Sequence, residues 1–442
     1  MACPGCEVVP TIESNASRLY LAPKLAHTRA TAIRQLRDRG WEVERLDDNV
    51  LYLKLSEAHA EAALDDLSWM LSRPEQSNCP ALLLSESEEF GVQHLGSTVP
   101  LAVLIARQEH RWLGDLLSEE RLEMHFQPIL HAESGRDIFA YECLARGIGR
   151  DGSTISPGQL FPAARASDLM FHLDRAARIA AIRQAAAKGI QENVFINFNP
   201  TSVYDPVFCL QTTFDEVERQ GSSPSRYVFE VVETDLIEDP GHLEGILQEY
   251  RRHGFRVALD DLGAGYGSLN LMQSIRPDFV KLDRGMVDGV SHDSYRASIT
   301  SRLIDMAREV GVAVIAEGIE TPEDWDWLRS HQVDYGAGIL FRTSRRPAAA
   351  AGLALLQRRP CECDIQTKNA GPRAGVFRGQ LRRLRRSGCS LTWPGRPACR
   401  CSWSRRSCWW PPSARPGRSA GTASAPLRQT SGSAQPPSRR RP

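Results

Sequence analysis

The sequence lacks an apolar run long enough to cross a lipid bilayer. Its longest apolar runs, such as residues 99–106, fall far short of the about 20 residues that a spanning helix needs. The opening MACPGCEVVP also lacks the basic region and following apolar stretch that mark a secretory signal. We therefore expect a cytoplasmic protein that has no membrane partner.

A disulfide framework is missing as well. Six of the 11 cysteines lie after residue 360, and the other five do not form the spaced set that staples a small secreted domain. Cys3 and Cys6 form a CPGC motif, which suits half of a zinc site or a redox pair, but there is no second CxxC and no nearby histidine pair. We expect inert thiols at these positions.

Net charge is absent only on average, since the chain has 54 basic and 54 acidic residues. Residues 1–360 hold 52 acidic and 37 basic residues, whereas residues 361–442 hold 17 basic and 2 acidic ones. The last segment contains 16 Arg, 11 Ser and 10 Pro, a composition that cannot bury enough apolar surface to offset the entropy of ordering it. We expect residues 360–442 to be a disordered tail.

Two explanations of this tail compete. An arginine-rich segment with scattered tryptophans is typical of an arm that binds nucleic acid. Out-of-frame translation of a GC-rich gene also yields this composition, and the change of character near residue 360 is abrupt. We favour the frameshift, expect no nucleic-acid partner, and note that resequencing the gene near codon 360 decides between them.

Between residues 119 and 341 the chain alternates short apolar runs with amphipathic segments. Eight runs are rich in strand-forming residues: LEMHFQPIL, IFAYECLAR, VFINFNP, YVFEVVETD, FRVALDDLGAGYG, DFVKLDR, VAVIAEGIET and YGAGILF. Amphipathic segments lie at residues 161–188, 242–253, 295–310 and 322–330, and Gly254 and Gly311 close two of them. This alternation predicts an α/β fold with a mostly parallel sheet, and eight runs in about 225 residues fit a TIM-like (β/α)8 barrel.

The residues before the barrel predict a small α/β module. Helices are expected at residues 27–39 and 57–71, and strands at residues 41–46 and 50–55. Residues 101–117 predict a helix that leads into the barrel. We divide the chain into a regulatory or dimerising module at residues 1–115, a barrel at 116–359 and the tail at 360–442.

Acidic and polar residues follow the apolar runs at their carboxyl ends. They are Glu142, Asn197, Glu230, Glu233, Asp260, Asp261, Lys281 and Glu317. In a parallel barrel these ends converge on one face, where barrel enzymes keep their active sites. A single carboxylate there is most simply a solvated charge, but five around one opening repel one another and cost several kcal/mol each to desolvate.

Cations resolve this repulsion. Two divalent ions supply a charge of +4, and with five carboxylates, Lys281 and one phosphodiester the total comes near −1. Ligands that are all oxygens favour Mg²⁺ or Mn²⁺ over zinc. Two such ions about 3.5–4 Å apart can activate a water molecule for in-line attack at phosphorus. Lys281 can orient that water, and Arg146 is placed to hold a phosphate.

The motifs HFQPIL, YECLAR, INFNP, FEVVE, ALDDLGAGYGSL, FVKLD and AEGIET occur in this order. In them the chain resembles the EAL-domain cyclic di-GMP phosphodiesterases over roughly residues 118–359. The resemblance implies a barrel that uses two Mg²⁺ or Mn²⁺ ions to hydrolyse cyclic di-GMP to linear pGpG, and a homodimer formed through the barrel.

The resemblance also implies roles for single residues. It matches Glu142, Asn197, Glu230 and Asp260 with the ligands of one metal. It matches Asp260, Asp261 and Glu317 with those around the other. Lys281 matches the lysine that orients the catalytic water. The resemblance implies that Glu317 and Glu142 are catalytic residues as well. Gln127, Arg146 and Asp283 match positions that contact substrate, and Glu233 matches the glutamate that holds the loop at residues 261–268.

Three positions depart from the family pattern. Cys143 replaces a small apolar residue, and free cysteine packs as a small hydrophobe, so we expect little harm. Ala264 stands where threonine is frequent. Ala337 stands where the family has a glutamine that helps to complete the site. We expect the loss of that glutamine's amide to weaken catalysis.

The sequence is compatible with two other functions. One is a degenerate barrel that senses cyclic di-GMP without cleaving it, which Ala337 favours and the full set of proposed ligands opposes. The other is a scaffold whose barrel presents the N-terminal module to a protein partner.

Overall fold

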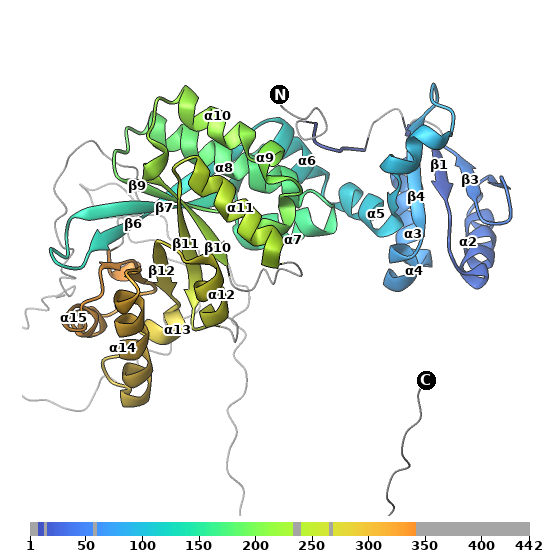
Figure 1. The fold of residues 1–442 in the computed structure, drawn as a ribbon. Helices are drawn as coiled ribbons and strands as arrows, with labels where there is room; N and C mark the ends of the chain where they lie inside the picture. Colours follow the sequence, from blue (N-terminus) through green and yellow to red (C-terminus); the bar gives the residue numbers. More distant parts are fainter. Residues whose placement is uncertain (1–7, 13–15, 56–59, 233–239, 265–267, 342–442) are drawn as a thin grey trace, which may run out of the picture. The chain divides into compact units, whose positions relative to one another are not determined.

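The computed structural model describes residues 8–12, 16–55, 60–232, 240–264 and 268–341 (Figure 1). Cys3, Cys6 and Glu233 lie outside these residues, and so does the tail at 360–442. The described residues form two separate main hydrophobic cores, one within residues 16–105 and one within residues 113–333. None of the helices in this part of the chain is both long enough and apolar enough to span a bilayer.

The N-terminal core belongs to a five-stranded antiparallel sheet with helices. Its elements are β1 (Ala16–Leu21), α2 (Ala26–Asp38), β2 (Val43–Arg45), β3 (Leu51–Lys54), α3 (Ala60–Met70), α4 (Arg73–Ser77), β4 (Pro80–Ser85), η1 (Val92–Ser97) and β5 (Val99–Pro100). The strand order is β2-β3-β1-β4-β5. The sequence predicted α2, β2, β3 and α3 but missed β1 and β4. These strands are buried on both faces for most of their length, so neither shows the alternation of a half-buried strand.

Two predicted helices are each broken in two. Residues 101–117 form α5 (Leu101–Glu109) and α6 (Arg111–Ser118), which are separated at His110. Residues 161–188 form the end of α7 (Pro157–Ala166) and α8 (Met170–Ala187). Between these two helices Asp168 has a φ of 55°, a left-handed conformation that an α-helix cannot contain.

The second core surrounds a closed barrel of eight strands, as the sequence predicted. The strands are β6 (Leu122–His131), β7 (Ile138–Ile148), β9 (Asn193–Asn197), β10 (Tyr227–Val232), β11 (Arg256–Leu262), β12 (Phe279–Leu282), β13 (Ala313–Ala316) and β14 (Tyr335–Gly336). Strand β6 closes the barrel by pairing with both β7 and β14. Strand β6 is antiparallel to both because a hairpin joins it directly to β7. The short β8 (Thr154–Ile155) pairs antiparallel with the end of β7.

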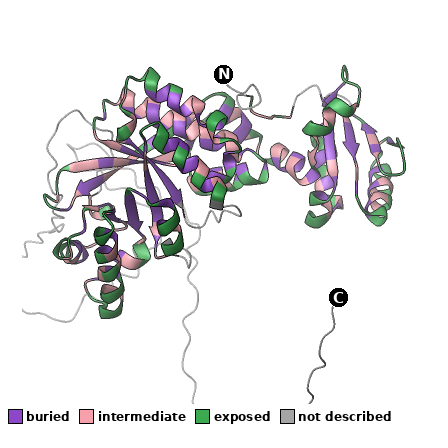
Figure 2. Cartoon of the chain, viewed as in Figure 1, coloured by how far each residue is buried: buried purple, intermediate pink, exposed green. Residues whose placement is uncertain are grey.

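Helices follow the parallel strands and cover them (Figure 1). Besides α7 and α8 they are η2 (Pro200–Ser202), α9 (Pro206–Cys209), α10 (Gln211–Arg219), η3 (Pro224–Arg226), α11 (Pro240–Arg252), α12 (Ser268–Ile275), α13 (Arg284–Val287), α14 (Ser294–Glu309) and α15 (Pro322–Ser330). Figure 2 shows the parallel strands as mostly buried and the outer helices as exposed on one side. The expected left-handed residues Gly254 and Gly311 end α11 and α14, with φ of 82° and 75°.

The last apolar run is shorter as a strand than its sequence suggests. Strand β14 ends at Gly336, and Ile339–Phe341 form the short helix η4. The backbone at Gly338 lies against that of Ile319, where an added Cβ would clash with the Ile319 carbonyl oxygen. This close approach of two backbones requires glycine at position 338.

Candidate active site

One ring of apolar side chains fills the barrel below the polar residues. It contains Ile129, Ala140, Phe195, Val228, Ala258, Phe279 and Ile315, and Ala337 packs against it from the level of Glu317. Because side chains of a strand alternate between its two faces, the residue two positions further along points into the same interior. On six strands that residue is polar: Glu142, Asn197, Glu230, Asp260, Lys281 and Glu317. The strand period therefore brings the predicted residues to one level of the barrel.

Lys281 lies at the centre of this polar layer. Its Nζ is 2.7 Å from Glu317 Oε1, 2.8 Å from Glu230 Oε1, 3.2 Å from Asp260 Oδ2 and 3.4 Å from Glu142 Oε1. These four carboxylates come from four different strands or strand ends. One ammonium group is thus the common partner of four negative charges.

Burial makes this cluster electrostatically demanding. The Lys281 and Glu230 side chains are 1% and 0% exposed. Burial raises the pKa of Glu230 well above its usual range, and neighbouring carboxylates add to this, although Lys281 opposes it. Burial likewise raises the pKa of Glu317 to about 8. Burial by itself would lower the pKa of Lys281, but the four carboxylates outweigh it and raise that pKa well above its usual range.

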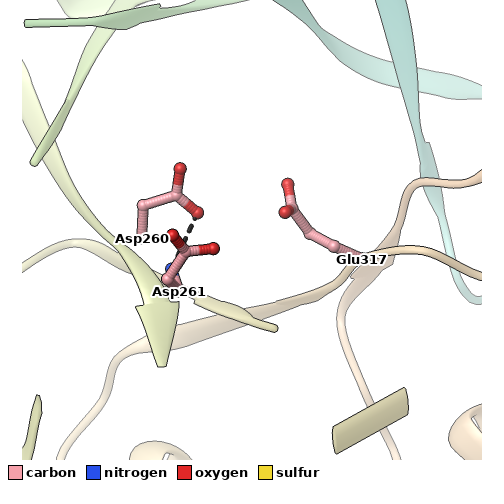
Figure 3. Close-up of side chains that lie close together, drawn as sticks. All are labelled: Asp260, Asp261 and Glu317. Atoms are coloured by element: carbon pink, nitrogen blue, oxygen red, sulfur yellow. Dashed lines mark hydrogen bonds between the residues drawn. The ribbon is translucent and has the colours of Figure 1, made fainter. Parts of the chain in front are cut away.

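Asp260, Asp261 and Glu317 form a second grouping at the mouth of the barrel (Figure 3). Each offers a carboxylate oxygen, and these oxygens lie within 4.8 Å of one another. Strand alternation alone would point the neighbours Asp260 and Asp261 to opposite faces. A register shift between Leu259 and Leu262 and a left-handed φ of 56° at Asp261 turn both toward the site.

The environment of Asp261 includes the negative charges of two other aspartates. Burial raises the pKa of Asp261 to about 6, and Asp260 and Asp283 contribute to the rise. The carboxylate of Asp283 caps α13, where its Oδ1 accepts a hydrogen bond of 2.7 Å from Gly285 N. Asp283 therefore lies close to the site, and one of its carboxylate oxygens is occupied by the hydrogen bond from the backbone of α13.

The remaining predicted residues are located by strand register. Asn197 on β9 lies directly beside Glu230 on β10, and Gln127 on β6 lies directly opposite Glu142 on β7. Arg146 follows on the same face of β7 as Glu142, and its guanidinium donates to the carbonyl of Ala145 at 2.8 Å. These three residues border the carboxylates and are not part of the cluster around Lys281.

The donors present fit hard divalent cations. Both Glu230 oxygens are buried and accept no well-directed hydrogen bond from the described residues, although Lys281 Nζ lies close to one of them. One Glu317 oxygen has the same character. Clustered oxygens with unused lone pairs are what Mg²⁺ and Mn²⁺ bind. Glu142, Asn197, Glu230, Asp260, Asp261 and Glu317 are thus the residues that could hold such ions.

The three departures from the family pattern occupy different environments. Cys143 points away from the site into the surrounding core, where burial raises its thiol pKa well above its usual range. Ala264 is exposed on the turn after β11. Ala337 is fully buried, and its amide donates to Ala316 O at 2.8 Å, one residue before Glu317. It therefore stands beside Glu317, at the level of the site.

One buried polar pair near the site was not found from the sequence. Asp174 and Arg178 on α8 are 5% and 0% exposed and form an ion pair. Their spacing of four residues within an alanine-rich helix is the only signal that the sequence offers. That signal is weak, because the same spacing is common on solvated helix faces.

Comparison with known proteins gives a family match over half of the chain. The model of the EAL domain matches residues 110–344. Two similar curated proteins, both 30% identical to the chain, come from Escherichia coli K12: the probable cyclic di-GMP phosphodiesterases PdeB and PdeG. The match covers 52% of this chain and 44% of PdeB, and 49% of this chain and 43% of PdeG. The chain thus spans less than half the length of these relatives.

Similar solved structures include a standalone EAL protein of Vibrio cholerae O395 in its c-di-GMP-bound form. It is 30% identical, with a TM-score of 0.46, over 50% of this chain and 90% of that chain. Another is the manganese and cyclic di-GMP complex of Klebsiella pneumoniae BlrP1. It is 22% identical, with a TM-score of 0.46, over 74% of this chain and 95% of that chain.

Proposed function

Because this chain belongs to the EAL domain family, we propose that it is a metal-dependent phosphodiesterase that hydrolyses cyclic di-GMP to linear pGpG. The observation that carries the proposal is the convergence of four carboxylates on Lys281 Nζ, all within 3.4 Å. A purely structural core has no use for so many buried charges, because apolar residues of similar volume would be as stable or more stable. The names of the two relatives support the same reaction.

The proposal assigns the metal ligands to two overlapping groups. Glu142, Asn197, Glu230 and Asp260 would hold one Mg²⁺ or Mn²⁺ ion, and Asp260, Asp261 and Glu317 would hold the other. When bound, the ions supply Lewis-acid activation of water and stabilise charge on the phosphate oxygens. The grouping of Asp260, Asp261 and Glu317 oxygens within 4.8 Å supports the second assignment.

The other residues act on the water and the substrate. Lys281 would hold the attacking water through its ammonium group while its charge offsets the carboxylates. Arg146 would bind a phosphate of the substrate, and Gln127 and Asp283 would contact the dinucleotide at the rim. In the reaction a water oxygen bonds to phosphorus, one P–O ester bond breaks, and the released ribose oxygen takes up a proton. Glu233 would hold the loop that follows Asp261.

Product analysis tests this function. The purified full-length chain, with and without Mg²⁺ or Mn²⁺, is incubated with cyclic di-GMP, and the products are separated by liquid chromatography. We expect metal-dependent formation of pGpG, and none in a Glu142→Ala variant. A wild-type protein that binds metal and cyclic di-GMP but forms no product would overturn the hydrolase assignment.

A cyclic di-GMP sensor is the second candidate function. It is favoured by Ala337, which stands beside Glu317 and brings no polar group to this position. Titration calorimetry with cyclic di-GMP in Ca²⁺ separates the candidates. Binding without Mg²⁺-dependent turnover supports the sensor, and no binding supports a scaffold that presents the N-terminal module.

We also propose an oligomeric state, a domain organisation and a location in the cell for this chain. We propose a homodimer formed through the barrel, which light scattering after gel filtration tests. The segment of residues 1–115 is proposed as a regulatory or dimerising module before a barrel of residues 116–359. The proposed location is the cytoplasm, which cell fractionation tests.

A further inference from the structure

Helix α8 contains a buried ion pair beside the loop that follows β9. Asp174 and Arg178 lie one turn apart on this helix, and both are buried. A buried pair of this kind adds little net stability, since apolar residues of the same volume often serve as well or better. Stability alone therefore does not account for the pair, and the contacts of Asp174 suggest another role.

Asp174 holds the loop between β9 and η2. Its Oδ1 accepts a hydrogen bond of 2.8 Å from Asn199 N, and its Oδ2 accepts one of 3.0 Å from Ser202 Oγ. Asn199 belongs to the loop that begins directly after Asn197, and Ser202 is the last residue of η2. The Asn199 side chain in turn accepts from Thr201 N at 3.0 Å and caps η2. One helical carboxylate thus holds both the loop and the helix η2 that follows it.

Arg178 fixes Asp174 in this orientation. Its Nη1 pairs with Asp174 Oδ2, and its Nε donates to Thr213 Oγ1 of α10 at 3.3 Å. The carboxylate therefore cannot rotate without breaking a buried ion pair. The chain of contacts runs from α10 through α8 to the backbone two residues after Asn197.

Both packing and hydrogen bonds hold this loop, since Phe198 is buried in the core and Asn199 N donates to Asp174. A cavity of about 310 Å³ lies on one side of it, and Asn197, Phe198, Asn199 and Asp174 are among the residues that line it. Side chains that line a cavity have fewer packing contacts on that side, so the hydrogen bonds of the loop contribute more to its position. Phe198 N also donates a hydrogen bond to Glu230 O at 3.2 Å, which ties the loop to β10.

We propose that Asp174 is a positioning residue, which acts through the Asn199 amide to hold the Asn197 side chain at the level of Glu230. This inference rests on the proposed function, in which Asn197 is a metal ligand. Residues that orient a ligand typically change metal affinity about 10–100-fold when they are removed. Asp174 would therefore set metal affinity although it touches no metal.

Two double variants of the full-length chain test the role of the acceptor oxygen. Asp174→Ala with Arg178→Met removes both buried charges and leaves the Asn199 amide without its acceptor. Asp174→Asn with Arg178→Met also removes both charges but keeps a carbonyl oxygen for that amide. Arg175→Met is the matched control on α8, since its Nε donates to Thr212 Oγ1 on α10 at 3.2 Å.

The readouts are Mn²⁺ affinity by titration calorimetry, the thermal midpoint, and hydrogen exchange of the Asn199 amide. We expect the alanine variant to bind Mn²⁺ about 10–100-fold more weakly and to exchange this amide faster. The asparagine variant and Arg175→Met should stay within about threefold of wild type. Equal Mn²⁺ affinity in the two double variants, both folded, would overturn the positioning role.

The wild-type chain provides two further checks. Its Asn199 amide should exchange slowly before any Mn²⁺ is added, and fast exchange would overturn the proposal even if the alanine variant does not fold. A wild-type chain that binds no Mn²⁺ at all would instead overturn the metal site of the proposed function. The two failures are therefore distinguishable.

Discussion

The barrel interior contains two adjacent layers that are built from the same strands and differ in chemistry. The lower layer is an apolar ring that includes Phe195, Val228 and Phe279. The upper layer, two residues further along, contains Asn197, Glu230 and Lys281. Both layers are largely buried. Burial of apolar groups stabilises the folded state, whereas burial of charged groups destabilises it.

This difference separates stability from function within one barrel. The lower layer stabilises the fold through burial and packing. The upper layer is held together by one lysine among four carboxylates, an arrangement that opposes folding unless cations or protons balance it. Mutations in the two layers should therefore affect different measurements.

The largest effect is expected for Glu142→Ala in the upper layer. Loss of a proposed metal ligand should lower the rate of cyclic di-GMP hydrolysis by at least about a thousandfold, since bound metals supply several kcal/mol of transition-state stabilisation. Its free energy of unfolding should stay near wild type, because Lys281 keeps three carboxylates. Turnover at the wild-type rate would refute the ligand assignment.

Phe195→Ala tests the lower layer. Removal of a fully buried ring should cost about 3–5 kcal/mol of the free energy of unfolding, measured by urea titration of the metal-free protein. Mn²⁺ affinity of the folded fraction should change much less than in Glu142→Ala. If Phe195→Ala were as stable as wild type, the apolar ring would not be the stabilising layer.

Lys281→Met removes the central cation from the upper layer. The four carboxylates then face one another, so the metal-free protein should lose up to about 3–5 kcal/mol at pH 8. The loss should shrink at pH 5, where the carboxylates take up protons, and Mn²⁺ should restore stability at pH 8. Lys54→Met, at an exposed lysine of the N-terminal sheet, is the control and should show neither effect.

The raised carboxyl pKa values predict proton release on metal binding. Glu317 has a pKa of about 8 and Asp261 of about 6, so near pH 7 the metal must displace protons, and Mn²⁺ affinity should rise between pH 6 and 8. In the metal-free protein the Glu317 contribution to stability is present below about pH 4.5 and is lost as pH rises through 8. Calorimetry in buffers of different ionisation enthalpy counts the protons, and a count of zero at pH 7 would contradict these pKa directions.

The smallest effect is expected for Ala337→Gln. This change returns an amide to the position beside Glu317, and we expect turnover to rise a few-fold, an effect of about 1 kcal/mol on the barrier. If a glutamine fails to raise turnover, Ala337 does not limit catalysis in this chain. Ala264→Thr on the exposed turn after β11 serves as the comparison.

The barrel was predictable from the sequence because its strands and helices alternate, and the site because its polar residues follow those strands. The strands β1 and β4 were not predictable in the same way, since burial on both faces removes the alternation that marks a strand. The breaks at His110 and Asp168 depend on local backbone conformations that an apolar periodicity does not report.

By itself the sequence determined which residue types reach the mouth of the barrel, because a strand period of two carries every side chain two positions past the apolar ring into the same interior. Only the tertiary structure decided that Lys281 would contact four carboxylates, that Asp261 would turn toward Asp260 through a left-handed backbone, and that Asp174 would hold the loop after Asn197. The contacts of Lys281 join residues far apart in the chain, and closure of the barrel is what brings them within a few ångströms.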